Sequence, residues 1–523
     1  MKSVCFCFKI HQPFRLKRYR FFDIGKDHYY YDDFADDEII SRVAAMSYIP
    51  MANTLLEMIE KSNKKFKFSI SISGTAIEQL QLYVPEVIDI FKKLADTGCM
   101  EILSGTYSHS LSSLEDPEEF VRDVKLHDST VHMLFGVKPK VFANTELIYD
   151  DDIALVIKSM GFKSAITEGA KHVLGWKSPN YLYSAAACPD LKLMFVNNKL
   201  TQDITRNFNN PSWHEYPLTA DKYMSWIAAL PEEEQIVNLY MPMDSFGTFL
   251  PQESGIFEFM KALPAFAQQM GVEFALPSEL SKKLKPVDEI VVMHPISDID
   301  EARDVSAWKG NDLQREALHK LYALAERVNL CSDRRLKQDW EYLQSSDHFY
   351  YMSTKKFADG ESHAAFSPYD SPYSAFTNYM NVLADFTVRV EGQYPEEIGN
   401  EELNSLLLTI SNQATEIHEL EKKVKTLRTN ILNADDATYA ENKEKPARKT
   451  VKKASKPKAA KKTTKAEPKV EPKAAKKAVK VEPKAEAKAE AKTVAKADVK
   501  AEAKAEAKTK KPVKKTTEPK PKK

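Results

Sequence analysis

The sequence predicts an α/β fold: a closed barrel of parallel strands over residues 1–285, followed by an α-helical domain over residues 286–396. Short apolar runs alternate with amphipathic stretches up to about Lys285, and from about Pro286 to Gly392 only helical periodicity continues. Strands that alternate with helices indicate βα units and a parallel sheet. About seven or eight such units in one block favour a barrel over an open sheet.

The predicted strands are rich in β-branched and aromatic residues, as strands usually are. In chain order they read VCFCFKI, KFKFSISIS, MEILSG, KVFANTE, KSAITEG, LKLMFV, IVNLYM and VEFALP. Segments such as PEVIDIFKKLADTG and DIALVIKSMGF separate them and have the periodicity of amphipathic helices. The functional residues of a parallel barrel lie at the carboxyl ends of its strands, so we expect the site there.

Two further segments follow the helical domain. Over residues 400–433 apolar residues recur every seven positions from Leu403 to Ile431, which predicts a two-stranded coiled coil and a homodimer through residues 403–431. A long helix folded back on its own domain is the alternative. Residues 434–523 are rich in Lys, Ala, Glu and Pro and are predicted to be disordered. This tail either makes weak contacts with a polyanion or only aids solubility.

Charge and hydropathy exclude several classes of protein. The chain has 75 Lys+Arg and 75 Asp+Glu, but residues 441–523 hold 30 basic and 11 acidic residues, so the tail carries +19 and the body −19. An acidic body excludes a uniformly basic nucleic-acid-binding fold. The sequence has neither an apolar run of membrane-spanning length nor a signal-peptide pattern, and its five cysteines are scattered. We therefore expect a cytoplasmic protein with reduced thiols and no membrane contact.

Polar residues stand at the carboxyl ends of four predicted strands, where no structural requirement explains them. In a parallel barrel these strand ends converge on one rim, so the side chains should lie close together. They are His11 and Gln12 after the first strand, Ser108 and His109 in SGTYSHS, Asn144 and Glu146 in KVFANTEL, and Asp244 after IVNLYM.

Five ordered segments over roughly residues 1–390 resemble the α-amylase-type members of glycoside hydrolase family 57. They are HQP, GTYSHSL, VFANTELIYD, NLYM(x)4FG with GIFEFMKALP, and QSSDHFYYM. The resemblance implies an incomplete (β/α)7 TIM-like barrel with a helical domain that closes over the site. It also implies action on an α-1,4-glucan or maltooligosaccharide with retention of configuration. The sequence itself has no Gly-rich phosphate loop and no dinucleotide fingerprint, so we expect no metal or other cofactor.

The resemblance assigns roles to individual residues. A retaining glycosidase needs a carboxylate nucleophile and a carboxylic acid about 5–5.5 Å apart. Glu146 matches the nucleophile of the family. The substrate ligands that the resemblance implies are His11 with Gln12, His109, Asp347 and His348 of the helical domain, and Trp176 in a loop near the sugar. For Trp176 a buried core position is the alternative.

The sequence departs from the family at the general acid. The family segment reads D-Y-E-T-F-G-E-H, whereas this chain has PMDSFGTF, so Pro242 occupies the acid position. Asp244 is the nearest replacement, but two residues along a strand displace a side chain by about 6.6 Å. Even about 1 Å matters for such geometry. Lys171 and Gln202 also stand where acidic residues are expected.

Two functions from different classes follow. The first is an α-glucan hydrolase or transglycosylase with Glu146 as nucleophile and Asp244 as acid. Its activity would be weakened because Pro242 replaces the general acid. The second is a catalytically degenerate glucan-binding or scaffold protein that dimerises through its coiled coil. A metal-dependent deacetylase would need paired histidines and an aspartate near the first strand. No acidic residue follows HQPF directly, and His127 and His132 lie on different faces of a predicted helix.

Overall fold

The computed structural model describes residues 2–355, 365–393 and Gln413. These residues belong to one compact unit, Met1–Glu421. Apart from Gln413, the predicted coiled coil over residues 400–433 lies outside the described residues, as does the predicted basic tail over residues 434–523.

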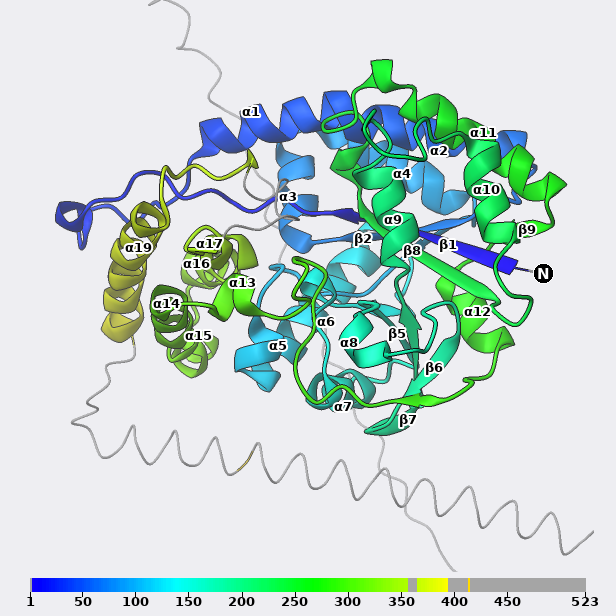
Figure 1. Ribbon diagram of the computed structural model, residues 1–523. Helices are drawn as coiled ribbons and strands as arrows, with labels where there is room; N and C mark the ends of the chain where they lie inside the picture. Colours follow the sequence, from blue (N-terminus) through cyan, green and yellow to red (C-terminus); the bar gives the residue numbers. More distant parts are fainter. Residues whose placement is uncertain (1, 356–364, 394–412, 414–523) are drawn as a thin grey trace, which may run out of the picture. The chain divides into compact units, whose positions relative to one another are not determined.

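Two five-stranded sheets form the centre of this unit (Figure 1). The first has the order β3-β2-β1-β8, and β9 also pairs with β1. The second has the order β10-β6-β7-β5-β4. Among these pairings only β6 with β7 is antiparallel. The strands are β1 (Lys2–Ile10), β2 (Phe68–Ile72), β3 (Met100–Ile102), β4 (Phe142–Ala143), β5 (Ser164–Thr167), β6 (Leu182–Ala185), β7 (Cys188–Phe195), β8 (Ile236–Pro242), β9 (Val272–Phe274) and β10 (Glu289–Ile290).

Isolated parallel bridges connect the two sheets. Ser104, just after β3, pairs with Phe142 of β4, and Val196, just after β7, pairs with Asn238 of β8. The strands β1, β2, β3, β4, β5, β7 and β8 therefore follow one another through parallel contacts. Their carboxyl ends consequently face the same way, which brings the polar strand ends of the sequence together.

Helices follow most of the parallel strands and cover the sheets. The longer ones before residue 290 are α1 (Asp33–Val43), α2 (Ile49–Lys61), α3 (Gly74–Tyr83), α4 (Pro85–Asp96), α6 (Pro117–Phe135), α7 (Asp151–Ser159), α9 (Asn198–Thr205), α10 (Ala220–Ala228), α11 (Ile256–Gln269) and α12 (Pro277–Lys283). Capping residues fix where several helices begin. At the start of α6, for example, the Asp116 side chain accepts hydrogen bonds from the backbone, and Pro117 suits the first turn. The apolar faces of α2, α4, α10 and α11 pack with the first sheet in one hydrophobic core.

The helical part shares a second core with the second sheet. Its helices are α13 (Ser306–Lys309), α14 (Asp312–Tyr322), α15 (Ala325–Leu330), α16 (Arg334–Leu343), α17 (Ser346–Tyr350) and α19 (Pro372–Gln393). Trp308, Trp340 and Tyr379 are buried there with Tyr183 and Phe195 of the second sheet. The helices are therefore bound to the sheet by a common apolar interior.

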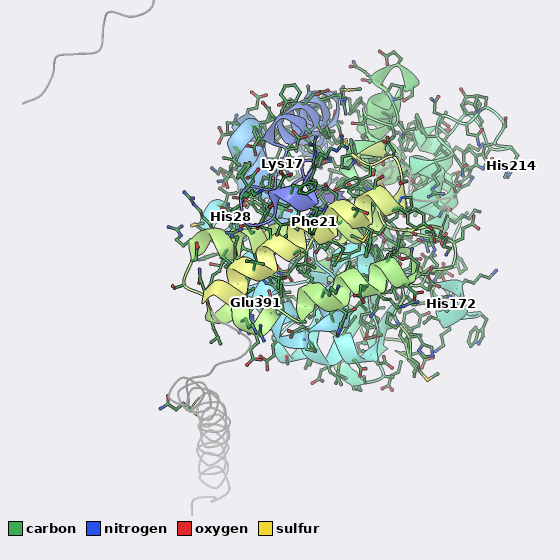
Figure 2. All side chains as sticks on the ribbon, turned by 90° about the vertical axis from the view of Figure 1, so that its left-hand side faces the viewer. Lys17, Phe21, His28, His172, His214 and Glu391 are labelled. Atoms are coloured by element: carbon green, nitrogen blue, oxygen red, sulfur yellow. The ribbon has the colours of Figure 1, made fainter. Side chains whose placement is uncertain are left out.

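The long connection between β1 and α1 reaches the last described helix. Figure 2 shows Phe21 and His28 beside α19, where the Asp385 carboxylate accepts hydrogen bonds from His28 Nδ1 at 2.8 Å and from the Gly25 amide at 2.6 Å. These contacts tie the amino-terminal part of the fold to the helical part.

The predicted VEFALP strand is present as β9 and pairs with the start of β1. Two features differ from the sequence-based expectation. The strand β6 forms an antiparallel hairpin with β7 that was not predicted, because its Ala186–Ala187 turn contains no Gly, Pro or Asn. A short strand, β10, lies in the region predicted to be only helical. No helix among residues 2–355 and 365–393 is both long and apolar enough to cross a bilayer.

Candidate active site

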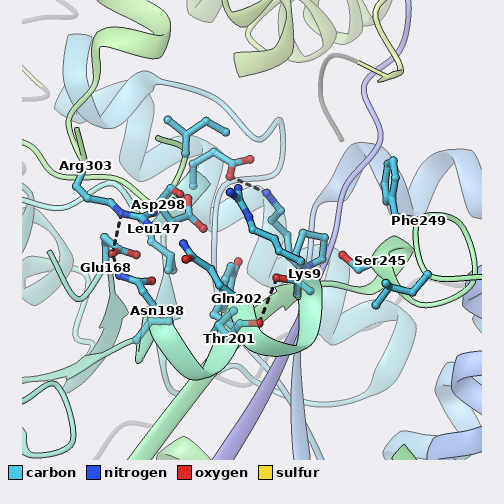
Figure 3. Close-up of a pocket in the computed structure, with 18 of the residues that line it drawn as sticks. Lys9, Leu147, Glu168, Asn198, Thr201, Gln202, Ser245, Phe249, Asp298 and Arg303 are labelled. Atoms are coloured by element: carbon cyan, nitrogen blue, oxygen red, sulfur yellow. Dashed lines mark hydrogen bonds and ion pairs between the residues drawn. The ribbon is translucent and has the colours of Figure 1, made fainter. Parts of the chain in front are cut away.

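A cavity of about 440 Å³ opens where the carboxyl ends of β1, β4, β5, β7 and β8 meet (Figure 3). A segment between β10 and α13 forms another part of its wall. The lining is mostly polar and includes Lys9, Glu146, Glu168, Asn198, Gln202, Arg206, Tyr240, Pro242, Asp298 and Arg303. This is the position at which parallel α/β folds place their ligands.

Glu146 lies at this rim in a strained turn. It belongs to the single turn Thr145–Leu147 that follows β4, and its φ of 45° is in the left-handed region. Asn144 stabilises the turn by donating a hydrogen bond to the Ile148 carbonyl at 2.9 Å. Strained backbone of this kind costs about 1–3 kcal/mol and is concentrated at functional sites. The turn directs the Glu146 side chain into the cavity.

Two donors hold the Glu146 carboxylate, which is only 1% exposed. Lys9 Nζ donates to Oε2 at 2.6 Å, and His109 Nε2 donates to Oε1 at 2.8 Å. Although burial alone would lower the pKa of Lys9, the charges of Glu146 and Asp298 raise it above its ordinary value. Lys9 is therefore a cation, and it stabilises Glu146 in the ionised form that a nucleophile requires.

The predicted histidines form a stacked pair beside Glu146. The rings of His11 and His109 lie 3.9 Å apart with an interplanar angle of 21°. His11 Nε2 donates to Asp347 Oδ2 at 2.7 Å, and Ser73 Oγ donates to His11 Nδ1 at 2.7 Å. The Ser73 side chain also caps α3. The structure thus brings residues of β1, the loop after β3 and the helical part into one network.

The helical part is fastened to this network by backbone bonds. The Ser346 amide donates to the His109 carbonyl at 3.0 Å, and Ser110 pairs with Ser345 in an isolated bridge. Asp347, the next residue, is thereby fixed against His11. These bonds explain how a residue more than 300 positions along the chain reaches the first strand.

The pKa of His11 is lowered to about 3 by burial and by the neighbouring His109, against the opposing charge of Asp347. Burial also lowers the pKa of His348 to about 4. Both imidazoles are therefore neutral at physiological pH. His11 acts in this site as a hydrogen-bonding group of fixed tautomer and carries no charge to transfer.

These lowered pKa values predict a loss of stability in acid. In the unfolded chain a histidine takes up a proton below about pH 6.5, whereas His348 and His11 remain neutral in the fold down to about pH 4 and 3. The unfolded state therefore binds more protons over this window, and the free energy of unfolding falls as the pH is lowered. Urea denaturation from pH 7 to 4 measures this slope.

Replacing one histidine measures how much that residue contributes to the pH dependence of the free energy of unfolding. We expect the His348→Gln variant to have a shallower slope than the parent between pH 6.5 and 4, because one proton-uptake site of the unfolded chain is gone. His214→Gln is the control, since the side chain of His214 is 80% exposed. An unchanged slope in His348→Gln would contradict the assignment of a neutral buried imidazole.

Asp244 and Gln12 lie around a smaller second pocket of about 30 Å³, which is also lined by His11 and Asp347. Lys9 and Pro242 line both pockets, whereas Glu146 lines the larger cavity. Asp244 stands in the turn Met243–Ser245 after β8. The Gln12 side chain accepts a hydrogen bond from Arg15 Nη2 at 2.7 Å. Gln12 thus belongs to a buried polar network at the edge of the site.

None of the predicted substrate ligands lines the larger cavity, and two of them, His348 and Trp176, line neither of the two smaller pockets beside it. His348 Nε2 donates to the Tyr342 carbonyl at 3.1 Å, and its ring lies 5.5 Å from that of Tyr379, inside the helical part. Trp176 is 92% exposed, which excludes the buried alternative, and it is absent from the lining of both pockets. Of the two positions expected to be acidic, Gln202 lines the cavity and Lys171 is exposed.

Five charged residues of the cavity were not predicted: Lys9, Glu168, Arg206, Asp298 and Arg303. Glu168 directly follows β5 and is fully buried; Arg303 Nε lies 3.5 Å from its Oε1 atom, and Asn198 Nδ2 also donates to it. Two of these residues could have been predicted from the sequence, because Lys9 lies inside an apolar strand and Glu168 stands at the end of one. Asp298 is one of several acidic residues in SDIDEARD, where nothing distinguishes it.

Within the described part of the chain, no group of three or more His, Cys, Asp or Glu side chains is arranged to hold a metal ion. The site consists of carboxylates, imidazoles and cations joined by hydrogen bonds and by ring stacking.

Comparisons with known proteins identify the family of this chain. The profile of glycosyl hydrolase family 57 matches residues 5–293. A putative alpha-amylase of Methanocaldococcus jannaschii is 37% identical over 464 residues, covering 84% of this chain and 96% of the relative.

Two solved structures share the fold at low sequence identity. The GH57-type branching enzyme of Pyrococcus horikoshii is 12% identical, with a TM-score of 0.55 over 77% of this chain and 93% of that chain. The GH57 branching enzyme of Thermococcus kodakaraensis is 13% identical, with a TM-score of 0.55 over 76% of this chain and 92% of that chain. The family profile and the 37% identical relative together show that this chain belongs to glycosyl hydrolase family 57.

Proposed function

We propose that this protein is an α-glucan hydrolase or transglycosylase that acts with retention through Glu146. The observation that carries the proposal is the position of the Glu146 carboxylate: it follows β4, enters a cavity of about 440 Å³, and has one oxygen held by Lys9 and the other by His109. A fixed carboxylate at a cavity wall can attack an anomeric carbon with little reorganisation.

The reaction would proceed in two steps. Glu146 forms a bond to the anomeric carbon while the glycosidic oxygen leaves with a proton from a general acid. Water or a sugar hydroxyl then attacks the glycosyl ester and releases Glu146. Water as acceptor gives hydrolysis, and a sugar as acceptor gives transfer. A polar cavity wall with Asn198, Gln202 and Arg206 offers donors and acceptors for sugar hydroxyls.

The names of the relatives support an α-1,4-glucan or a maltooligosaccharide as substrate. The 37% identical relative is named a putative alpha-amylase, and the similar structures are those of branching enzymes. His11, His109 and Asp347 are the proposed ligands beside the reacting sugar, because hydrogen bonds and the stacked histidine rings join them to Glu146.

The finer architecture is part of the same proposal. The parallel bridges between the two sheets support an incomplete (β/α)7 barrel. The heptad repeat over residues 403–431 supports a homodimer, and the basic tail supports weak polyanion contact in a cytoplasmic protein.

A degenerate glucan-binding protein is the second candidate, and two observations favour it. Pro242 has no ionisable group at the position that matches the general acid. In addition, the ammonium group of Lys9 lies 2.6 Å from Glu146 Oε2, where it neutralises the carboxylate and weakens it as a nucleophile. In that case the cavity would bind a glucan without cleaving it.

Turnover assays separate the two candidates. The full chain is incubated with maltoheptaose and with α-maltosyl fluoride, whose leaving fluoride needs little acid assistance, and the first product is followed by proton NMR. We expect turnover with the α anomer released first. Calorimetric binding of maltoheptaose without turnover of either substrate would support the binding protein. A β anomer as first product would contradict retention.

A further inference from the structure

The replacement of the general acid by Pro242 raises the question of which group can give a proton beside Glu146. Lys9, His109 and Asp298 are ionisable groups that hydrogen-bond to the Glu146 side chain. Lys9 is a poor donor, because neighbouring carboxyl groups raise its pKa above the ordinary value of a lysine. The Nε2–H of His109 is engaged with Glu146 Oε1, and its ring is stacked on His11.

Asp298 is fixed beside Glu146 by the backbone. Its amide donates to the Glu146 carbonyl at 3.1 Å, and its own carbonyl accepts from Arg303 Nη1 at 2.6 Å. Two residues earlier, Ile296 pairs with Tyr149 in an antiparallel bridge. The segment that carries Asp298 is thus attached along the strained turn of Glu146, although the two residues are far apart in sequence.

The Asp298 side chain faces the reacting position. It lines the same cavity as Glu146, and Figure 3 shows it beside Leu147 at the cavity wall. Its carboxyl hydrogen-bonds to the Glu146 carboxyl. Its Oδ1 atom is shielded from solvent and has no hydrogen-bond partner among the described residues. A buried oxygen of this kind usually has a partner, so a hydroxyl or glycosidic oxygen of a ligand would complete its bonding.

Asp298 also holds its proton near neutral pH. Burial and the charge of Glu146 raise its pKa to about 7, against the opposing charges of Lys9 and Arg303. The charges of Lys9, Asp298 and Glu146 also act on the hydroxyl group of Tyr240 in β8. Two adjacent carboxyl groups share one proton because both cannot be ionised at low cost. Glu146, paired with Lys9, is the partner that remains ionised, and Asp298 is the partner that is protonated.

We propose that Asp298 is the general acid and base of this site and replaces the donor lost at Pro242. This assignment rests on the proposed function. In the first step the Asp298 proton passes to the glycosidic oxygen as Glu146 bonds to the anomeric carbon, and the cleaved chain leaves as an alcohol. In the second step the ionised Asp298 takes a proton from water or from a sugar hydroxyl as that oxygen attacks the glycosyl ester and releases Glu146.

The step requires that substrate separate the two carboxyl groups. They are hydrogen-bonded in the free protein, whereas retaining chemistry uses a separation of about 5–5.5 Å. The Asp298 main chain is fixed by the bonds to Glu146 and Arg303, so rotation of its short side chain is the movement needed. When the sugar enters, the Asp298 side chain would give up its contact with Glu146 and contact the glycosidic oxygen of the sugar instead.

The Asp298→Asn variant tests the assignment by comparing two leaving groups. We expect turnover of maltoheptaose to fall by about 10²–10⁴-fold, the usual contribution of a general acid. The kcat/KM of α-maltosyl fluoride, which reports the first step, should fall by less than about 10-fold, because fluoride leaves without a proton. The parent rate on maltoheptaose should decline above about pH 7 as Asp298 ionises. Asp190→Asn, at a side chain that is 85% exposed, is the control for charge removal.

Chemical rescue supplies a second readout. Azide is small enough to attack the glycosyl ester without base assistance, so Asp298→Asn with α-maltosyl fluoride and azide should yield α-maltosyl azide. The same experiment with Asp244→Asn tests the other aspartate predicted from the sequence. Folding of each variant is checked by its urea midpoint.

The outcomes distinguish this assignment from the proposed function. A parent that turns over neither substrate contradicts the proposed function and the assignment with it. An active parent whose Asp298→Asn variant keeps its rate on maltoheptaose contradicts only the assignment of Asp298. Equal loss of kcat/KM on both substrates, without formation of α-maltosyl azide, would make Asp298 a positioning residue and overturn its role as proton donor. If Asp244→Asn, and not Asp298→Asn, loses turnover of maltoheptaose while it still turns over α-maltosyl fluoride, the proton donor is Asp244.

Discussion

Glu146→Gln is expected to lower turnover of both maltoheptaose and α-maltosyl fluoride by at least about 10³-fold. The glutamine side chain has nearly the same shape but lacks the negative charge needed to form the glycosyl ester. Because a good leaving group cannot replace a nucleophile, the fluoride should not rescue the rate. This pattern differs from that of a missing acid, for which the fluoride is turned over. Initial rates on both substrates, measured side by side, provide the comparison.

The control for this prediction is Glu258→Gln. Its side chain is 78% exposed on α11 and pairs with Lys261, away from the cavity. We expect it to retain the parent rate on both substrates. Parent-like turnover by Glu146→Gln would show that the nucleophile is a different group.

Lys9→Met is expected to lower the free energy of unfolding by about 3–5 kcal/mol, the usual effect of removing one partner of a buried ion pair. The Lys9 and Glu146 side chains are only 11% and 1% exposed. Without Lys9, the Glu146 carboxylate would be buried with Asp298 and without its cation. Urea denaturation at pH 7 measures the difference.

Two further variants make the prediction specific. Lys17→Met removes a more exposed pair, since the Lys17 and Asp27 side chains are 31% and 45% exposed, and should cost at most about 1 kcal/mol. The double variant Lys9→Met with Glu146→Gln removes both charges and should recover much of the loss. Equal effects of Lys9→Met and Lys17→Met would contradict a structural ion pair in the active site.

The sequence predicted those parts of the fold and site that depend on local pattern. Parallel strands buried on both faces have continuous apolar runs, as in VCFCFKI, and polar residues at their ends stand out against them. His11, His109, Glu146 and Asp347 were identified in this way and by their motifs, and they form one network in the structure. Their convergence follows from the common direction of the strands.

Residues outside such patterns could not be predicted. Asp298 reaches Glu146 through a loop whose path is set by backbone pairing with the turn at Tyr149, a contact between distant segments that has no sequence periodicity. The side chain of His348 enters the helical part because the Tyr342 carbonyl accepts its hydrogen bond. Lys9 is the exception, since a lysine within a buried strand already indicates a charged partner.

Mass spectrometry of the protein during turnover tests the central assignment most directly. A 5-fluoro-α-maltosyl fluoride should slow the release of the glycosyl ester, because the ring fluorine destabilises the positively charged transition state of both steps. We expect a stoichiometric mass increase equal to one fluorosugar unit, located by peptide analysis at Glu146 and absent from Glu146→Gln. Turnover of this compound with the sugar attached to another residue, or with no attached sugar, would contradict Glu146 as the nucleophile.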